Sequence, residues 1–147
     1  MIINIFLPMT PPAGTAQQRK ISFRSGRTYL PAHVKRAQKA FTDALQPYIP
    51  DTPLSGPLKV TQRWYYPFPA SRRRKGIAIA PKTTIGDADN IAKLLNDVIT
   101  RCGIWTDDRL IYSLSVEKYW VDPNTYPIGI EILIVEKQEN YETEKRH

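Results

Sequence analysis

The sequence has a single cysteine, Cys102, among its 147 residues, so no disulfide can form within the chain. It has neither a CxxC nor an HxxxH pattern, which disfavours a zinc site of the usual ligand spacing. No apolar run approaches the roughly 20 residues that cross a bilayer, and the N-terminal stretch lacks the basic leader of an export signal. We therefore expect a cytoplasmic protein with no membrane partner.

Acidic residues are nearly absent from the first half of the chain. Residues 1–86 hold 14 Lys and Arg against 2 Asp and Glu, whereas residues 87–147 hold 7 against 12, and the formal net charge is +7. A basic segment of this size favours a polyanionic partner, and nucleic acid is the commonest one. The alternative is a charged surface that only keeps the protein soluble.

Hydrophobic periodicity predicts a single α+β domain over residues 1–137, followed by a polar tail at 138–147. The expected strands form one mixed sheet of about four members, at residues 2–7, 58–66, 109–120 and 128–136. The expected helices, where apolar residues recur at three- and four-residue steps, cover residues 32–48 and 90–102. The segments 16–29 and 67–86 carry no period and are expected to be loops, the second one mobile.

Two acidic pairs flank the second predicted helix. Asp87 and Asp89 stand two positions apart just before it, and Asp107 and Asp108 follow its C-terminal end. If the next strand returns beside the start of the helix, one of the later pair meets Asp87 and Asp89. Three carboxylates in one place repel each other unless a cation lies between them, and oxygen ligands favour Mg²⁺ or Mn²⁺. Asn90 adds a further oxygen.

Each of these residues also has a purely structural interpretation. Asp87 or Asp89 can cap the helix or interact with its dipole, and the later pair can form a turn. Lys93 stands four residues from both Asp89 and Asp97, so it can form surface ion pairs with them. Taken together, beside a basic half, the residues favour metal-dependent chemistry on a phosphate group.

The stretch GDADNIAKLLNDVITRCGIWTDDRLI, residues 86–111, resembles the signature of the RusA family of Holliday-junction resolvases. The matching positions are Asp87, Asp89, Asn90, Lys93, Asp97, Trp105, Asp107 and Asp108. The resemblance implies a small α+β homodimer that cuts four-way DNA junctions with Mg²⁺, for which Mn²⁺ is a substitute. It implies that Asp87, Asp89 and Asp108 bind the metal and that Lys93 is catalytic beside them. Asn90, Asp97 and Asp107 then have secondary roles.

The basic run Arg72–Lys75 departs from the family pattern, in which arginines directly precede the first aspartate. Here the stretch GIAIAPKTTIG separates the run from Asp87. Tyr65, Tyr66 and Phe68 are candidates for stacking on exposed bases, although aromatic residues of strands more often belong to a core. Contacts with DNA phosphates are expected from the two loops, at Arg24, Arg27, Arg72, Arg73, Arg74, Lys75 and Lys82.

The expected function is therefore resolution of Holliday junctions by paired symmetric nicks, in DNA recombination and repair. A metal-dependent nuclease for flaps, forks or single strands would use the same chemistry. A phosphohydrolase of small substrates fits the carboxylates but not the basic half. In a non-catalytic nucleic-acid-binding module, the first acidic pair would serve only as a helix cap. Asp108 argues against this alternative, because it lies too far along the chain to cap that helix.

Overall fold

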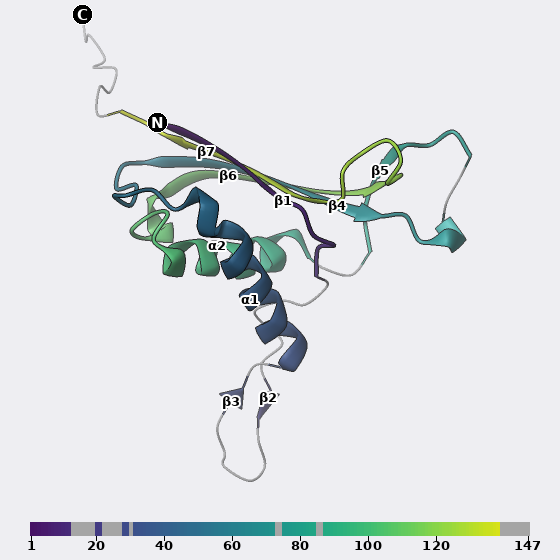
Figure 1. Cartoon of the computed structure of the whole chain (residues 1–147), viewed down its shortest axis with the longest axis horizontal. Coiled ribbons are helices and arrows are strands. Elements are labelled where there is room, and N and C mark those ends of the chain that lie inside the picture. Colours follow the sequence, from purple (N-terminus) through teal and green to yellow (C-terminus); the bar gives the residue numbers. More distant parts are fainter. Residues whose placement is uncertain (13–19, 22–27, 30, 73–74, 85–86, 139–147) are drawn as a thin grey trace, which may run out of the picture.

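A five-stranded mixed sheet forms one layer of the fold (Figure 1). The computed structural model describes residues 1–12, 20–21, 28–29, 31–72, 75–84 and 87–138. In spatial order the strands are β1 (Ile2–Leu7), β7 (Gly129–Glu136), β4 (Leu58–Pro67), β6 (Ile111–Val121) and β5 (Ile79–Pro81). Only β4 and β6 pair in parallel, and the other neighbours are antiparallel. A separate ribbon pairs β2 (Lys20–Ile21) with β3 (Thr28–Tyr29).

Two helices, α1 (Ala32–Leu45) and α2 (Ala88–Cys102), cover one face of the five-stranded sheet (Figure 1). Gly103 ends α2 with a φ of +82°, the left-handed backbone that glycine adopts without strain. Three short 3-10 helices are η1 (Gln46–Tyr48), η2 (Ala70–Arg72) and η3 (Asp108–Leu110). Most of the apolar positions predicted from the helical spacing are buried, namely Val34, Ala37, Phe41, Leu45, Ile91, Leu94, Leu95, Val98 and Ile99. The predicted positions Ala44, Tyr48 and Cys102 are only partly buried.

Strand β4 lies at the centre of the sheet and alternates between a buried face and a more exposed one. Its buried face is the one that meets the helices, because Trp64 packs edge to face on Phe41 of α1. The two ring centroids lie 6.0 Å apart and their planes meet at 86°. Both side chains are fully buried, and such a contact adds a specific geometry to the free energy of apolar burial.

A chain of buried hydrogen bonds joins α2 to β4. The Gln62 side-chain amide donates to the Asn96 oxygen at 2.7 Å, and the Trp64 indole N–H donates to the Gln62 oxygen at 3.0 Å. Gln62 is fully buried and Asn96 nearly so. A buried amide left without a partner costs about 1–3 kcal/mol. These bonds therefore fix both the rotation of α2 and its position along β4.

The structure confirms the predicted α+β domain, with five strands in the main sheet rather than about four. The missed strand, β5, has three residues and ends at Pro81, so it is too short to show a period. The prediction of one mobile loop over residues 67–86 is therefore wrong, because η2 and β5 both lie inside it. Helix α1 ends at Leu45 and continues as the 3-10 turn η1, where Pro47 interrupts the hydrogen-bond pattern.

Strand β6 starts near the C-terminal end of α2 and ends near the N-terminal end of α2. The chain turns at Gly103 and enters β6 beside the C-terminal end of the helix, so β6 runs antiparallel to α2 (Figure 1). The last residues of β6, Tyr119–Val121, pair with β5, from which the chain proceeds to the start of α2. None of the described helices is both long enough and apolar enough to cross a membrane.

Candidate functional site

The N-terminus of α2 presents two exposed carboxylates. Asp87 is the N-cap residue, but its side chain makes no capping hydrogen bond to the helix. The Asn90 side-chain amide donates to Asp87 Oδ2 at a long 3.5 Å. Asp89 lies in the first turn, where negative charge is favourable. The capping interpretation therefore does not account for the Asp87 side chain.

Lys93 is exposed one turn after Asp89. It forms no ion pair with Asp89 or with Asp97, although the spacing allows both. The same spacing does produce an ion pair in α1, where Lys39 Nζ lies 2.9 Å from Asp43 Oδ2. In this structure Lys93 therefore does not form the surface ion pairs with Asp89 and Asp97 that its spacing allows.

Asp107 and Asp108 differ in their environments, although they are adjacent. Asp107 caps η3, because one carboxylate oxygen accepts from the Arg109 backbone N–H at 2.8 Å and the other from the Arg109 guanidinium at 3.0 Å. These bonds hold the pKa of Asp107 below its ordinary value. Partial burial raises the pKa of Asp108, and the neighbouring charges of Asp107 and Asp97 raise it further. Asp107 is thus held by Arg109, whereas Asp108 forms no close ion pair with a described residue and interacts with the Arg109 guanidinium only at longer range.

The structure divides the acidic residues into two groups along α2. Asp87 and Asp89 lie at its N-terminus, and Asp108 lies near Asp97 toward its C-terminus. Eight residues of helix between Asp89 and Asp97 correspond to about 12 Å. Within the described residues, no three Asp, Glu, His or Cys side chains are close enough together to hold a metal ion. The expected meeting of Asp108 with Asp87 and Asp89 therefore does not occur within one chain, because β6 returns to the start of α2 with its last residues.

The segment that leads to Asp87 is attached to the end of β6. The Lys82 backbone N–H donates to the Lys118 carbonyl at 2.9 Å, and Lys118 Nζ donates to the Thr84 carbonyl at 3.2 Å. The Lys82 ammonium lies 4.5 Å from the centroid of Tyr66 and 5.0 Å from that of Trp120. Each contact is a cation–π interaction that stabilises the charged amine away from water. These contacts hold residues 82–84 against β4 and β6. Asp87, the first carboxylate, follows three residues after Thr84 in the sequence.

Lys82 is a DNA-contacting residue in the sequence prediction, but it is only 7% exposed. Its ammonium group is enclosed by aromatic rings, so the structure gives it a role in attaching this segment instead. Nothing in the local sequence signals this, since Tyr66 and Trp120 come from two different strands. Arg24, Arg27, Arg73 and Arg74 lie outside the described residues, and Arg72 ends η2.

The aromatic residues proposed for base stacking have different surroundings. Tyr66 is buried in the core, and this burial raises its pKa. Phe68 stacks on Trp120, with centroids 6.3 Å apart. Tyr65 stacks on Tyr119 at 5.8 Å and is partly exposed. Tyr65 and Phe68 are thus both partly exposed, whereas Tyr66 is not available for stacking on a base.

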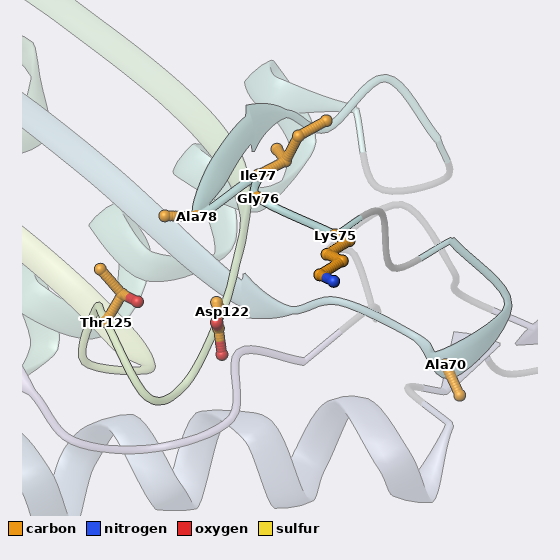
Figure 2. Close-up of a pocket in the computed structure, with 7 residues that line it drawn as sticks. All are labelled: Ala70, Lys75, Gly76, Ile77, Ala78, Asp122 and Thr125. Atoms are coloured by element: carbon orange, nitrogen blue, oxygen red, sulfur yellow. The ribbon is translucent and has the colours of Figure 1, made fainter.

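An open pocket of about 590 Å³ lies where β4 and β6 end (Figure 2). Figure 2 shows Lys75, from the basic run, and Asp122, which directly follows β6, on two sides of this space. The Asp122 backbone N–H donates to the Ala78 carbonyl at 2.8 Å, so the wall of the pocket is attached to the segment before β5. The pocket therefore lies at the same end of the sheet as Asp87 and carries the last residue of the basic run.

Comparison with known proteins gives one family match. A protein-family model described as endodeoxyribonuclease RusA matches residues 8–134 of the chain. No curated protein matches the chain closely enough to count as a relative. The matched region contains both acidic groups, Lys93 and the pocket, so the whole candidate site lies inside it.

Asp107→Asn and Asp108→Asn are expected to shift the free energy of unfolding in opposite directions at neutral pH. The lowered pKa of Asp107 means that its charge stabilises the fold above the ordinary value of 3.8, a contribution lost as the pH falls through the lower folded value. The raised pKa of Asp108 means that its charge opposes folding above the folded value. Asp107→Asn should therefore destabilise the protein and Asp108→Asn should slightly stabilise it.

Urea unfolding in EDTA, at neutral pH and at about pH 3, measures both effects, and both should shrink at the lower pH. Asp51→Asn, at an exposed position distant in sequence from the acidic groups, is the control. Shifts of the same sign for Asp107→Asn and Asp108→Asn at neutral pH would contradict the difference between their environments.

Proposed function

Because the chain belongs to the RusA family of endodeoxyribonucleases, we propose that it resolves Holliday junctions by paired symmetric nicks in DNA recombination and repair. The charge distribution supports a DNA substrate, since residues 1–86 hold 14 Lys and Arg against 2 Asp and Glu. Neutralising DNA phosphates with such residues releases counterions, which makes binding strong at low salt. The carboxylates that follow this basic segment supply the chemistry.

The cofactor in this proposal is Mg²⁺, for which Mn²⁺ is a substitute, and its ligands are Asp87, Asp89 and Asp108. The observation that carries this assignment is that none of the three carboxylates forms an ion pair with a described residue. Oxygen-only donors of this kind fit a hard divalent ion. When bound, such an ion lowers the pKa of a coordinated water and polarises the scissile phosphate.

Lys93 stabilises the charge that builds on the phosphate oxygens during in-line attack. Its ammonium group is exposed one helical turn from Asp89 and has no ion pair with Asp89 or Asp97. A donor that is held near the reacting group and not engaged by a carboxylate can bind developing negative charge. The run Arg72–Lys75, together with Arg24 and Arg27, holds the junction arms through phosphate contacts.

A second copy of the chain completes the metal site. A single chain separates Asp87 and Asp89 from Asp108, as described above. A four-way junction has approximate two-fold symmetry, which a two-fold symmetric homodimer with two sites matches. In this dimer, each site takes Asp87 and Asp89 from one subunit and Asp108 from the other.

Replacing any of the three ligands by the isosteric amide is expected to abolish cleavage and to leave junction binding intact or tighter. Asp87→Asn, Asp89→Asn and Asp108→Asn each remove a metal ligand and a negative charge that faces DNA. The measurement is cleavage of a labelled four-way junction, a flap, a fork and a duplex, each with and without Mg²⁺. Asp51→Asn is the matched control and should cut normally.

Near wild-type cleavage by one of these variants would remove that residue from the site. Faster cleavage of a flap or fork than of the junction would identify a different branched substrate. Binding that is indifferent to Mg²⁺, with no cleavage of any substrate, would instead support a non-catalytic module.

Mixing two inactive variants is expected to restore nicking if the site is shared between subunits. In a heterodimer of Asp87→Asn with Asp108→Asn, one site carries both substitutions and the other carries none. Each variant alone has no intact site, so activity in the mixture requires a shared site. Single-strand nicking of a junction, after subunit exchange, should approach half of the wild-type site number in the heterodimer population. No recovery after demonstrated exchange would place all the ligands of each site in one subunit.

Lys93→Met is expected to fold, dimerise and bind a junction with Mg²⁺, yet to cut it about 10²–10³-fold more slowly, the usual scale for one such donor. Lys93→Arg tests the geometry, because a planar guanidinium does not copy a compact ammonium group. Lys59→Met, at an exposed position on β4, is the control for a lost surface charge. Single-turnover cleavage by Lys93→Met within tenfold of wild type would return Lys93 to a surface role.

A further inference from the structure

The open pocket beside the end of β6 has two walls that come from distant parts of the sequence (Figure 2). One wall is the segment at residues 75–78, which precedes β5, and the other is the turn at residues 122–126, which follows β6. The space of about 590 Å³ lies within the usual range for ligand pockets, about 300–1,000 Å³. None of the carboxylates assigned to the metal is among the described residues that line it.

Backbone hydrogen bonds fix both walls of the pocket. The Asp122 carbonyl accepts from the N–H groups of Thr125 and Tyr126, each at 2.9 Å. The Asp122 side chain accepts from the Asn124 N–H at 3.1 Å, so the turn is closed by three hydrogen bonds. The Asp122 N–H donates to the Ala78 carbonyl at 2.8 Å and ties the two walls together. The pocket is therefore preformed, and a ligand that enters it does not have to order the walls first.

The lining of the pocket combines a cation, a hydroxyl group and apolar surface. Lys75 and Thr125 are exposed and belong to different walls (Figure 2). Ile77, which is 38% exposed, and the methyl groups of Ala70 and Ala78 supply the apolar part. A nucleotide carries the complementary features, namely an anionic phosphate, a base edge of donors and acceptors, and a flat base face. The lining thus matches a nucleotide better than a purely apolar ligand.

Gly76 keeps one wall of the pocket accessible. Its φ is +86°, a backbone conformation that glycine adopts without strain. Apart from its neighbours in the chain, no atom lies within 4 Å of the position that a Cβ would take. A ligand can therefore approach the Gly76 backbone closely, as it can at few residues that carry a side chain.

An unpaired nucleotide can enter this pocket, whereas a nucleotide inside duplex DNA cannot. In a duplex the base is stacked on both faces and its pairing edge is occupied, so it has to leave the helix to reach a concave site. Leaving the helix costs free energy, and the cost is least for a base that is already unpaired. Bases are most easily unpaired at the branch point of a junction, flap or fork. Occupancy of the pocket therefore favours branched DNA over duplex DNA.

We propose that this pocket holds one unpaired nucleotide from the branch point of the DNA substrate, with its phosphate on Lys75 and its base edge on the Thr125 hydroxyl. This inference rests on the proposed function and names the site by which the protein distinguishes branched DNA from duplex DNA. Asp87 follows Ala78 by nine residues, so the pocket and the start of α2 are at most about 30 Å apart. One bound junction therefore reaches both.

A carboxylate inside the pocket should weaken binding of branched DNA selectively. Thr125→Glu repels the phosphate and occupies the space, and Thr52→Glu, at another exposed threonine, is the matched control. Both are made in an Asp89→Asn background, which is expected to bind DNA without cutting it. Thr125→Glu should raise the Kd for a four-way junction about tenfold or more, and the Kd for a duplex no more than Thr52→Glu does.

Thr125→Val tests the hydroxyl group alone, because valine has nearly the same shape. Loss of one hydrogen bond to the base edge should raise the junction Kd about two- to tenfold and leave the duplex Kd unchanged. Thr52→Val should change neither value.

A fluorescent base reports occupancy of the pocket independently of affinity. 2-Aminopurine, whose emission rises when it leaves the stack, replaces each branch-point base of the junction in turn. Saturating Asp89→Asn protein should raise the emission about threefold or more at one of these positions, because the base is taken out of the helix. Adding Thr125→Glu should abolish the rise at saturation, and adding Thr52→Glu should preserve it.

Equal changes in the junction and duplex Kd on Thr125→Glu would contradict the pocket assignment. An emission rise that Thr125→Glu leaves intact at saturation would do the same, since the base would then be held elsewhere. Competition against the junction by a deoxynucleoside monophosphate at micromolar concentration would overturn the assignment in favour of a free nucleotide.

The pocket and the proposed function fail separately. A protein with Thr125→Glu as its one substitution that cuts junctions normally and still prefers them to duplex would overturn the pocket and leave the function standing. Unstacking at the branch point that depends on Thr125, in a protein that cuts no branched DNA, would support the pocket and overturn the function.

Discussion

The buried hydrogen bonds among Gln62, Asn96 and Trp64 fix the position of α2, and the candidate site depends on that position. An apolar stripe alone tolerates small rotations of a helix, because dispersion and burial have no strong direction. A buried amide does not, since a shifted Asn96 would leave Gln62 without an acceptor. The orientation of α2 that satisfies these bonds exposes Asp89 and Lys93 on the same helix.

The path from β4 to β6 through α2 explains why the carboxylates are divided. Parallel strands require a crossover connection, and α2 is part of it, so the helix runs opposite to the strand that follows. One acidic pair precedes the helix and the other follows it, so they lie at opposite ends. The same geometry places Asp108 just before the first residue of β6, and the segment that leads to Asp87 beside the last residues of β6. Bringing the two acidic groups together within one chain would require α2 to leave its position on β4, which the buried Gln62–Asn96 hydrogen bond holds.

Local features of the sequence predicted much of this structure. The stripe of α2 and the glycine that ends it are short-range signals, and both were read correctly from spacing alone. The direction of β6 depends on long-range pairing with β4, which no local period encodes. The enclosure of Lys82 by Tyr66 and Trp120 was missed for the same reason, because it is made by side chains from different strands. The roles of the site residues remain predictions, since a single chain does not assemble them.

The attachment of residues 82–84 to β6 gives the molecule an internal optical probe. Of its three tryptophans, Trp64 and Trp105 have no exposed surface, and their emission reports on the core. Trp120 is partly exposed, and its ring lies 5.0 Å from the Lys82 ammonium, beside the segment that leads to Asp87. A movement of that segment changes the charge and polarity around this one indole. A change in the position of residues 82–84 would therefore alter the intrinsic fluorescence of Trp120, which can be measured without an attached dye.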